Sequence, residues 1–231
     1  MKNIFKIILA TLIALPLYAF RLSPLSDSII IGKDKNTVVY QVTNNTDKPM
    51  AIEASLVKRE MNIDGSEKLP AVDDKNFIIY PNQIILKPAE KRGIKVTWLG
   101  QNDIKSELSY RLKIEQLPID FDKKKKTGIK IIMKYLGALY ISKEEFKADI
   151  HVDSISVEKD EVVFTVENRG TSHQLLKNLK LKIKKKILLE ADSLKGFAGE
   201  NVLAKKKRRF RLKKDLFKEV PKVNEVVLVY E

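Results

Sequence analysis

The residues most able to do catalytic or metal chemistry are few and scattered in this sequence. It contains two histidines, His151 and His173, and no cysteine. The absence of cysteine excludes thiolate zinc sites, disulfides and cysteine nucleophiles, and the two histidines are not spaced like metal ligands. We expect His151 on the polar side of a strand and His173 in a solvent-exposed turn within "NRGTSHQLL".

Acidic residues and short motifs give no stronger signal for catalysis. Asp73 and Asp74 form a carboxylate pair before a strand that could bind a cation, but a turn or capping role fits this position better. The sequence contains no G-x-S-x-G, H-E-x-x-H or phosphate-binding loop, and no identifiable pair of acids for glycoside hydrolysis. We therefore expect a protein that is not an enzyme and that uses no nucleotide, metal or other cofactor.

The chain is strongly basic, with a formal net charge of +14. Such a balance suits nucleic acid, an anionic membrane surface or an acidic partner. The basic residues concentrate in runs at 123–126, 184–186 and 205–211, and Phe210 is the only aromatic residue inside these runs. Nucleic-acid binding would need more aromatic residues for base stacking. We therefore expect no nucleic-acid partner and interpret the runs as solvated loops and strand edges, where lysine discourages unwanted pairing.

The N-terminal stretch "MKNIFKIILATLIALPLYAF" is typical of a signal peptide. Lys2 and Lys6 precede an apolar run from Ile7 to Leu17, and Ala19 offers a small residue for cleavage. The apolar run is shorter than the roughly 20 residues that a membrane span needs. We expect export to the periplasm with cleavage after Ala19, and no stable membrane insertion.

Short alternating apolar segments separated by turn residues predict strands throughout the chain. The clearest strands are expected in "NTVVYQVTNN", in "LSYRLKIEQ" and in "NFIIYPNQIILKPAEKRGIKVTWL", where one strand runs around Phe77 to Tyr80 and Trp98 is expected in the core. The segment "NIDGSEK" predicts a turn with Asp-Gly at its centre, and the only helical candidates are 142–147 and 213–219. Spacing of 8 to 12 residues between strands is typical of immunoglobulin-like sandwiches. We expect an all-β protein with two such domains in tandem, at 20–141 and 142–231.

The first half of the sequence resembles a known family. The segments "YQVTNNTDKPMAIEASLVKREMNIDG", "DDKNFIIYPNQIILKPAEKRGIKVTWLG" and "SYRLKIEQLPIDF" follow the order found in the first domain of periplasmic pilus-assembly chaperones. These are the PapD-like chaperones of the chaperone–usher pathway, and the likeness is nearest to their archaic-type branch. It covers most of 22–141, while the second domain resembles the family only through "VVFTVENRGTSH" and "FAGENVLAKKKRRF".

The resemblance implies two immunoglobulin-like domains in a boomerang arrangement and a chaperone function. In this family the last strand of the first domain is donated to a pilin subunit that lacks its own last strand, which is a form of β-augmentation. The subunit is then delivered to an outer-membrane usher. The donor residues implied here are Ile129, Ile131 and Met133, and the alternative donors are Ile119 and Phe121.

The resemblance also implies an anchor for the carboxylate at the end of the pilin subunit. One family anchor is a lysine on the donated strand, which falls on Lys130, and the other is an arginine on the first strand, where this sequence has Ser28. Arg111 on the neighbouring strand could substitute for that arginine. A basic side chain would bind a carboxylate through a charge-assisted hydrogen bond.

Other interpretations remain open from the residues alone. The segment "GIKIIMKYLGALYI" is apolar on both faces, which suits either a donated strand or a central strand buried on both sides within its own domain. An adhesive or structural pilus module with tandem sandwiches, or a basic exported protein that binds polyanions, would share the same composition.

Overall fold

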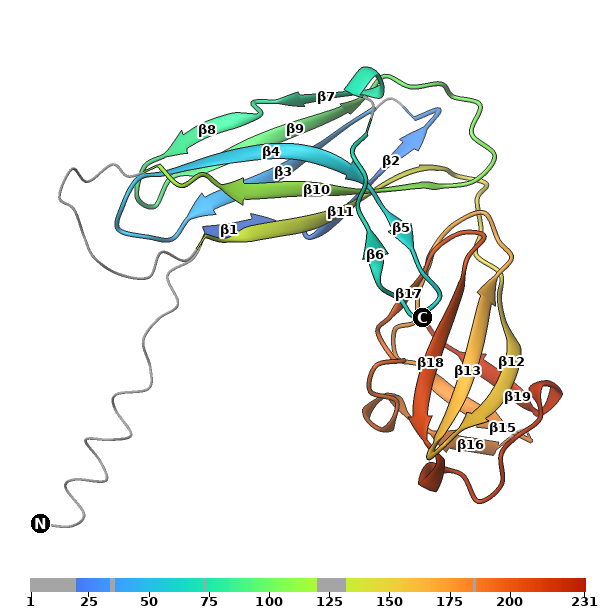
Figure 1. Ribbon diagram of the computed structural model, residues 1–231. Coiled ribbons are helices and arrows are strands. Elements are labelled where there is room, and N and C mark those ends of the chain that lie inside the picture. Colours follow the sequence, from blue (N-terminus) through green and yellow to red (C-terminus); the bar gives the residue numbers. More distant parts are fainter. Residues whose placement is uncertain (1–19, 34–35, 73, 120–131, 185) are drawn as a thin grey trace, which may run out of the picture.

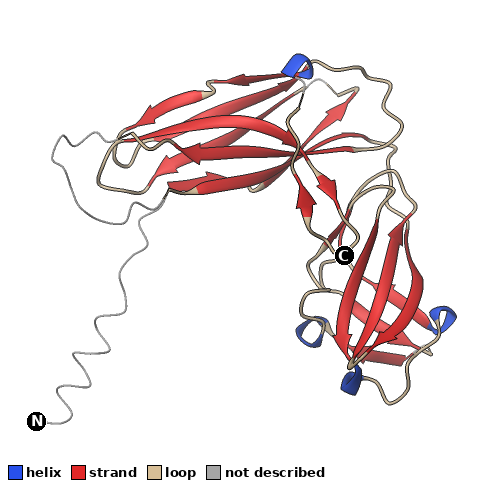
Figure 2. Ribbon diagram, in the orientation of Figure 1, coloured by secondary structure: helices blue, strands red, loops and turns tan. Residues whose placement is uncertain are grey.

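The computed structural model describes residues 20–33, 36–72, 74–119, 132–184 and 186–231. These residues form two β-sandwiches that meet at an angle, with the first across the top of Figure 1 and the second below it. Figure 2 shows that strands dominate both sandwiches, and that helical structure in the described part of the chain is limited to short 3₁₀ turns. The expected all-β fold with two immunoglobulin-like sandwiches is confirmed.

The first sandwich consists of a four-stranded and a five-stranded sheet. The order of the first sheet is β1-β3-β9-β7, and the order of the second is β2-β11-β10-β4-β8. β11 runs antiparallel to β10 and parallel to β2. The strands are β1 Phe20–Ser23, β2 Ser26–Ile31, β3 Thr37–Asn44, β4 Met50–Lys58, β7 Phe77–Tyr80, β8 Gln83–Leu86, β9 Lys91–Trp98, β10 Leu108–Gln116 and β11 Lys134–Lys143.

Alternation of apolar and polar residues places one side of most of these strands in the core. β3 buries Val38, Tyr40, Val42 and Asn44 in turn, and the residues between them are exposed or half-buried. Trp98 and Tyr110 each pack edge-to-face against Phe77, with ring centroids 4.9 Å apart. Both are core residues, because their rings are enclosed by the two sheets.

The second sandwich is smaller and is built from short sheets. β12-β13-β18 form one sheet, β16-β15-β19 form another, and β14 pairs with β17. Its core contains a cluster of phenylalanines in which Phe197 stacks on Phe210, with ring centroids 4.1 Å apart. The strands are β12 Ile150–Glu158, β13 Glu161–Asn168, β14 Gln174–Leu175, β15 Lys180–Ile183, β16 Lys186–Leu189, β17 Asn201–Val202, β18 Lys207–Lys213 and β19 Val226–Val229.

One strand in each sandwich ends in a fully buried asparagine that fastens neighbouring loops. At the end of β3, the Asn44 side-chain amide donates to the carbonyl oxygens of Leu86 and Lys87. At the end of β13, the Asn168 amide donates to the carbonyl oxygens of Ser172 and Val202. Each amide thus holds together the backbone segments around the end of its strand.

A β-hairpin from the first sandwich reaches the second. Its strands are β5 (Glu60–Met61) and β6 (Glu67–Lys68), joined by the Asp-Gly turn that the sequence predicts. Figure 1 shows the hairpin descending from the first sandwich alongside β18. Met61 is buried in the core of the second sandwich, and the Ile63 carbonyl accepts a hydrogen bond from the Arg209 N–H at 2.6 Å. The hairpin therefore forms a second connection between the two sandwiches, in addition to the linker that follows β11.

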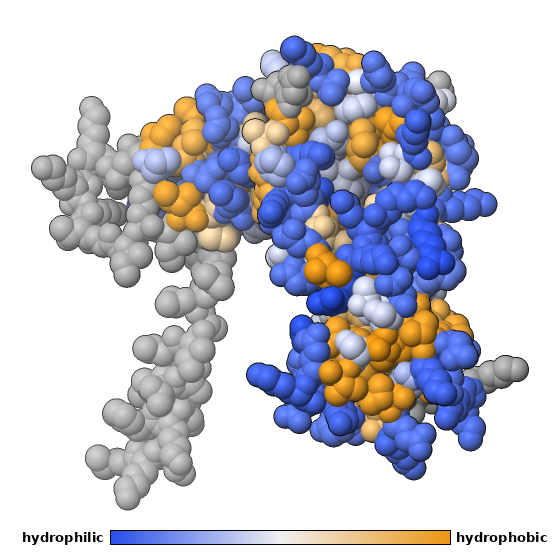
Figure 3. All heavy atoms as spheres, turned by 45° about the vertical axis from the view of Figure 1, so that its right-hand side comes forward, coloured by the Kyte–Doolittle hydropathy of each residue, from blue (hydrophilic) through white to orange (hydrophobic). Residues whose placement is uncertain are grey.

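Apolar side chains also gather on the surface of the second sandwich (Figure 3). Val157 on β12 and both Val227 and Val229 on β19 are exposed, and these two strands lie close together. In the part of the chain that the structure describes, β19 pairs with β15 along one edge only.

Candidate functional site

Two arginines and one glutamate form a charged cluster where the sandwiches meet. Arg111 lies on β10, Arg59 follows β4, and Glu67 lies on β6 of the hairpin. The Glu67 carboxylate accepts from Arg111 Nε at 2.9 Å and Nη2 at 2.6 Å, and from Arg59 Nε at 2.7 Å. The Arg59 side chain is only 5% exposed. We call these three residues the Glu67 cluster.

The Glu67 cluster lines a pocket of about 320 Å³ between the sandwiches. Arg208 of β18 lines the same pocket and pairs with Glu200 at 2.6 Å. Gly65 in the hairpin turn lies directly against Arg208, because a Cβ there would come within 2.5 Å of the guanidinium. The pocket therefore presents three guanidinium groups, of which two share one carboxylate. Such a site suits a further carboxylate from a ligand.

Burial alone would raise the pKa of Glu67. Hydrogen bonds and positive charge from Arg111 and Arg59 outweigh that effect and hold the pKa below its ordinary value. A carboxyl group whose pKa is depressed by folding stabilises the folded state fully above the unfolded value of about 4.3. This contribution is lost as the pH falls through the lower folded-state pKa.

The urea concentration at the midpoint of unfolding should therefore decrease as the pH is lowered below about 4. It should fall more steeply in the native protein than in Glu67→Gln, whose amide keeps the shape and does not titrate. Urea titrations at pH 7, 5, 4 and 3 measure the difference, and all other carboxylates contribute equally to both proteins. Parallel curves between pH 5 and pH 3 would show that Glu67 titrates alike in the folded and unfolded states.

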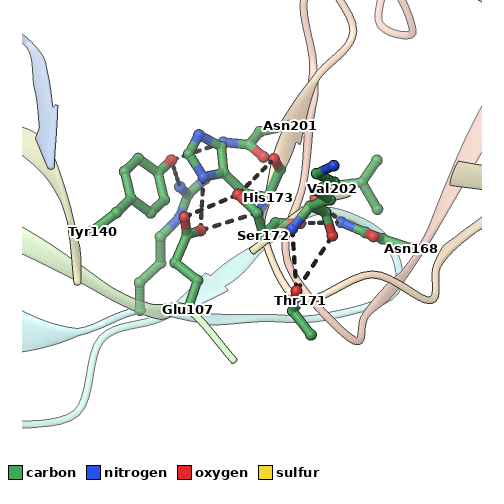
Figure 4. Close-up of polar contacts among 10 residues, drawn as sticks. Glu107, Tyr140, Asn168, Thr171, Ser172, His173, Asn201 and Val202 are labelled. Atoms are coloured by element: carbon green, nitrogen blue, oxygen red, sulfur yellow. Dashed lines mark hydrogen bonds and ion pairs between the residues drawn. The ribbon is translucent and has the colours of Figure 1, made fainter. Parts of the chain in front are cut away.

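A second group of polar contacts connects the sandwiches directly and is drawn in Figure 4. Glu107 precedes β10 and is buried, and it accepts from the N–H of His173 at 3.1 Å and from Ser172 Oγ at 3.2 Å. His173 Nδ1 lies 2.7 Å from the same carboxylate, and its ring stacks on Tyr140 with centroids 3.7 Å apart. Tyr140 Oη in turn lies 2.8 Å from Asn201 Nδ2. We call these five residues the joint.

The prediction that His173 lies in a solvent-exposed turn is wrong. Its side chain is mostly buried, because Tyr140 of β11 covers one ring face and Glu107 binds its edge. His151 is exposed and pairs with Asp149 at 2.6 Å, as expected for the polar side of a strand. The sequence could not reveal the joint, since Glu107 and His173 are 66 residues apart and share no motif.

β11 has a backbone edge that is open over part of its length. Met133 O accepts from the Gln116 N–H of β10, whereas the Ala138 N–H donates to Leu25 O on the other side. Because successive residues of a strand point their backbone groups in opposite directions, the N–H and C=O groups of Lys134 and Leu136 face away from β10. β2 pairs with β11 only from Ala138 onward, so these groups have no backbone partner among the described residues.

The side chains of β11 differ along its length. Near the open edge, Ile132 and Leu136 are exposed, while Met133 and Tyr135 pack against the first core. From Gly137 to Ser142 every residue is buried. Leu139 and Ile141 belong to the first core, whereas Ala138 and Tyr140 belong to the second core. The interpretation of a strand buried on both sides thus holds for this second half, but the two sides are covered by different domains.

The sequence-predicted site residues fall into two groups. Arg111 lines the pocket, Met133 packs against the first core, Ile119 is half exposed, and Ser28 lies opposite Tyr140 in the β2–β11 register. Asp74 begins a 3₁₀ turn. Sequence reasoning did not select Arg59, Glu67, Glu107, Ile132 or Leu136 as site residues. Only Ile132 and Leu136 carried a signal in the sequence, because they belong to the run "GIKIIMKYLGALYI", which is apolar on both faces. The remaining candidates, Ile129, Lys130, Ile131, Phe121 and Asp73, lie outside the described residues.

The described residues contain no group of three or more metal-ligating side chains in reach of one ion. No helix among them has the length and apolar character required to cross a bilayer.

Comparison with known proteins identifies the family. Residues 22–139 match the model of the N-terminal domain of PapD, described as a pili and flagellar-assembly chaperone. No curated protein matches the chain. The open edge of β11 lies inside this matched region, which also supplies half of the residues that line the pocket.

Solved structures share the fold of both sandwiches. One is the complex of the chaperone CsuC with the tip adhesion subunit CsuE from archaic Csu pili of Acinetobacter baumannii, with 17% identity, a TM-score of 0.62, and coverage of 84% of this chain and 88% of that one. The class 5 fimbriae chaperone CfaA has 15% identity and a TM-score of 0.59, and the match covers 92% of this chain and 99% of that one. The complex of the SafA pilin with the SafB chaperone from Salmonella enterica has 12% identity and a TM-score of 0.57, and the match covers 94% of this chain and 99% of that one. Because residues 22–139, half of the chain, match the family model, the chain belongs to the family of pili and flagellar-assembly chaperones.

Proposed function

We propose that this protein is a periplasmic chaperone that binds pilin or fimbrial subunits by donor-strand complementation and delivers them to an outer-membrane usher. The open edge of β11 carries this proposal. Its backbone groups at Lys134 and Leu136 are free to pair with a strand of the client, and exposed apolar side chains flank them. β-Augmentation uses these two elements, since main-chain bonds give affinity and alternate side chains give specificity.

The pocket beside the Glu67 cluster supports the same proposal. β11 leads from its open edge directly to Ala138 and Tyr140, which line this pocket. A client strand that pairs with β11 would end close to Arg111, which could bind the terminal carboxylate. Lys130 is retained as a second proposed anchor, and the proposed donor residues are Ile129, Ile131 and Met133, with Ile119 and Phe121 as the alternative.

Several features support the periplasmic setting and the partners. The family consists of pilus-assembly chaperones, and the first 19 residues have the composition of a cleavable signal peptide. Two of the similar structures are chaperones solved with a tip adhesion subunit and with a pilin. Binding and release by strand exchange require no nucleotide, so we propose a function without enzymatic activity.

Co-purification from the periplasm with the subunit encoded nearby tests this function. The native protein should give a 1:1 complex. Ile131→Asp should lose that complex if the proposed donor face enters the client, because a buried carboxylate without a partner is strongly unfavourable. Ile132→Asp tests the next residue, which is exposed just before β11 begins. Val227→Asp, on the exposed surface of the second sandwich, is the matched control and should retain the complex.

Each variant must remain folded by circular dichroism for the comparison to count. A complex that survives Ile131→Asp but is lost in Ile119→Asp or Phe121→Asp would move the donor segment to the alternative residues. Donor-strand complementation would be contradicted by a complex that survives all of these changes, or by the absence of a complex with any β-protein encoded near this gene.

A further inference from the structure

The outer face of the β1-β3-β9-β7 sheet has an unusual composition. Arg21, Lys91 and Lys95 project from it together with Val39, Ile78 and Tyr80, and the intervening positions are threonine, glutamine, serine or glycine. All six side chains are exposed or lie at the surface. We call these six residues the basic-apolar face. It lies on the opposite sheet from β11, so neither the open edge nor the pocket uses it.

The charges on this face are all positive. Arg21 and Lys91 flank Thr43 across three neighbouring strands, and Lys95 lies four residues after Lys91 on β9, beyond Gly93. No carboxylate projects from the face, and none of its three cations forms an ion pair within the described residues. Some exposed cations elsewhere on this protein are paired, as Lys207 is with Asp153 and Arg211 is with Glu158. The face therefore attracts an anionic partner.

The apolar part of the face is equally exposed. Tyr80 is 70% exposed and Ile78 is 51% exposed, and both belong to the edge strand β7. Val39 lies across Gly93, where an added Cβ would come within 3.1 Å of Val39 Cγ1. Gly93 presents no side chain, which leaves room for Val39 at this point of the face.

The arrangement of the residues distinguishes a lipid surface from an acidic protein. Lys95 lies between Val39 and Tyr80 in the strand register, at the centre of the apolar residues. A protein interface usually places apolar residues at its centre and charges at its rim, because burying a charge carries a large desolvation cost. At a bilayer surface, lysine can cover apolar groups with its stem and keep its ammonium among the phosphates, and tyrosine favours the same depth.

We propose that the basic-apolar face binds the anionic phospholipid headgroups of a bilayer surface, as a peripheral contact without insertion of any segment. A chaperone held in this way would stay close to the membrane across which its clients are exported. This contact is separate from client binding and stands even if the clients are not pilins.

Co-sedimentation with vesicles tests the proposal, using the purified mature protein at 100 mM salt. Vesicles of phosphatidylcholine with 30% phosphatidylglycerol should bind it, and pure phosphatidylcholine vesicles should not. Each basic residue near an anionic surface contributes a several-fold increase in binding, so Lys91→Gln with Lys95→Gln should weaken binding about tenfold. Ile78→Ser should weaken it about threefold by removing apolar contact.

The control removes the same charge elsewhere. Lys206→Gln with Lys214→Gln changes two exposed lysines of the second sandwich and should weaken binding less than threefold. Equal losses in the two double variants would show that a basic protein binds anionic vesicles without using this face, and would overturn the proposal. So would absence of binding to phosphatidylglycerol vesicles. Binding only to native membranes that is lost after protease treatment would identify an acidic protein partner instead.

Discussion

Replacing Glu67 with alanine is expected to lower the free energy of unfolding by about 2–4 kcal/mol. The change leaves the Arg59 guanidinium, which is 5% exposed, with Tyr140 Oη as its remaining side-chain partner. It also leaves two guanidinium groups facing each other without the carboxylate that they share. A buried charge that loses its partner carries the full cost of desolvation. Partial access of water to the pocket reduces this cost to the lower part of its usual range.

Urea unfolding at pH 7 measures the effect, and Glu144→Ala is the comparison. Glu144 forms an ion pair with Lys33 in which both side chains are well exposed, so its loss should produce no resolvable change. If Glu67→Ala and Glu144→Ala unfold at the same urea concentration, the Glu67 cluster contributes no more than a surface ion pair. The double variant Arg59→Met with Glu67→Leu removes both charges and should recover part of the loss.

Replacing Gly170 with alanine should have a comparable effect by a different route. A Cβ at this position would overlap the backbone of Lys147 and Asp149, in the linker between β11 and β12. The Lys147 carbonyl and the Asp149 carbonyl accept hydrogen bonds from the Thr171 and Arg169 N–H groups. Displacing the linker would stretch these bonds and move the loop that carries His173. Overpacking together with weakened hydrogen bonds should lower the free energy of unfolding by about 2–4 kcal/mol.

This variant should also change the arrangement of the two sandwiches, which small-angle scattering can measure as a larger radius of gyration. Arg169→Ala is the neighbouring control, because it removes an exposed ion pair with Glu167 and keeps the backbone contacts. A Gly170→Ala protein with native stability and native scattering would show that the linker can move without cost to the joint.

Much of the fold could be predicted because its determinants are local. The strand expected around Phe77 to Tyr80 is β7, and the Asp-Gly turn lies at the tip of the hairpin. Turn residues and alternation act over a few positions, so they can be recognised without knowledge of the rest of the chain. Trp98 was likewise expected in the core and is buried there.

The site depends on contacts that are distant in the sequence, and these could not be predicted. Arg59 reaches Tyr140 across 81 residues, and Arg111 reaches Glu67 across 44. Arg111 was singled out as a partner for a client carboxylate, but the carboxylate that it binds in this structure is supplied by its own hairpin. Nothing in the spacing of these residues indicates that the hairpin turns toward the second sandwich rather than folding back on the first.

β11 contributes alternate side chains to the cores of both sandwiches, and a shift in its register would therefore carry a large free-energy cost. A shift by one residue would place Tyr140 in the core of the first sandwich and Leu139 against His173 in the joint. Both sandwiches would have to repack at once, so the free protein holds this strand in a single alignment. A client strand therefore pairs with a strand of fixed register, and the position at which pairing begins is set by the sequence of the client.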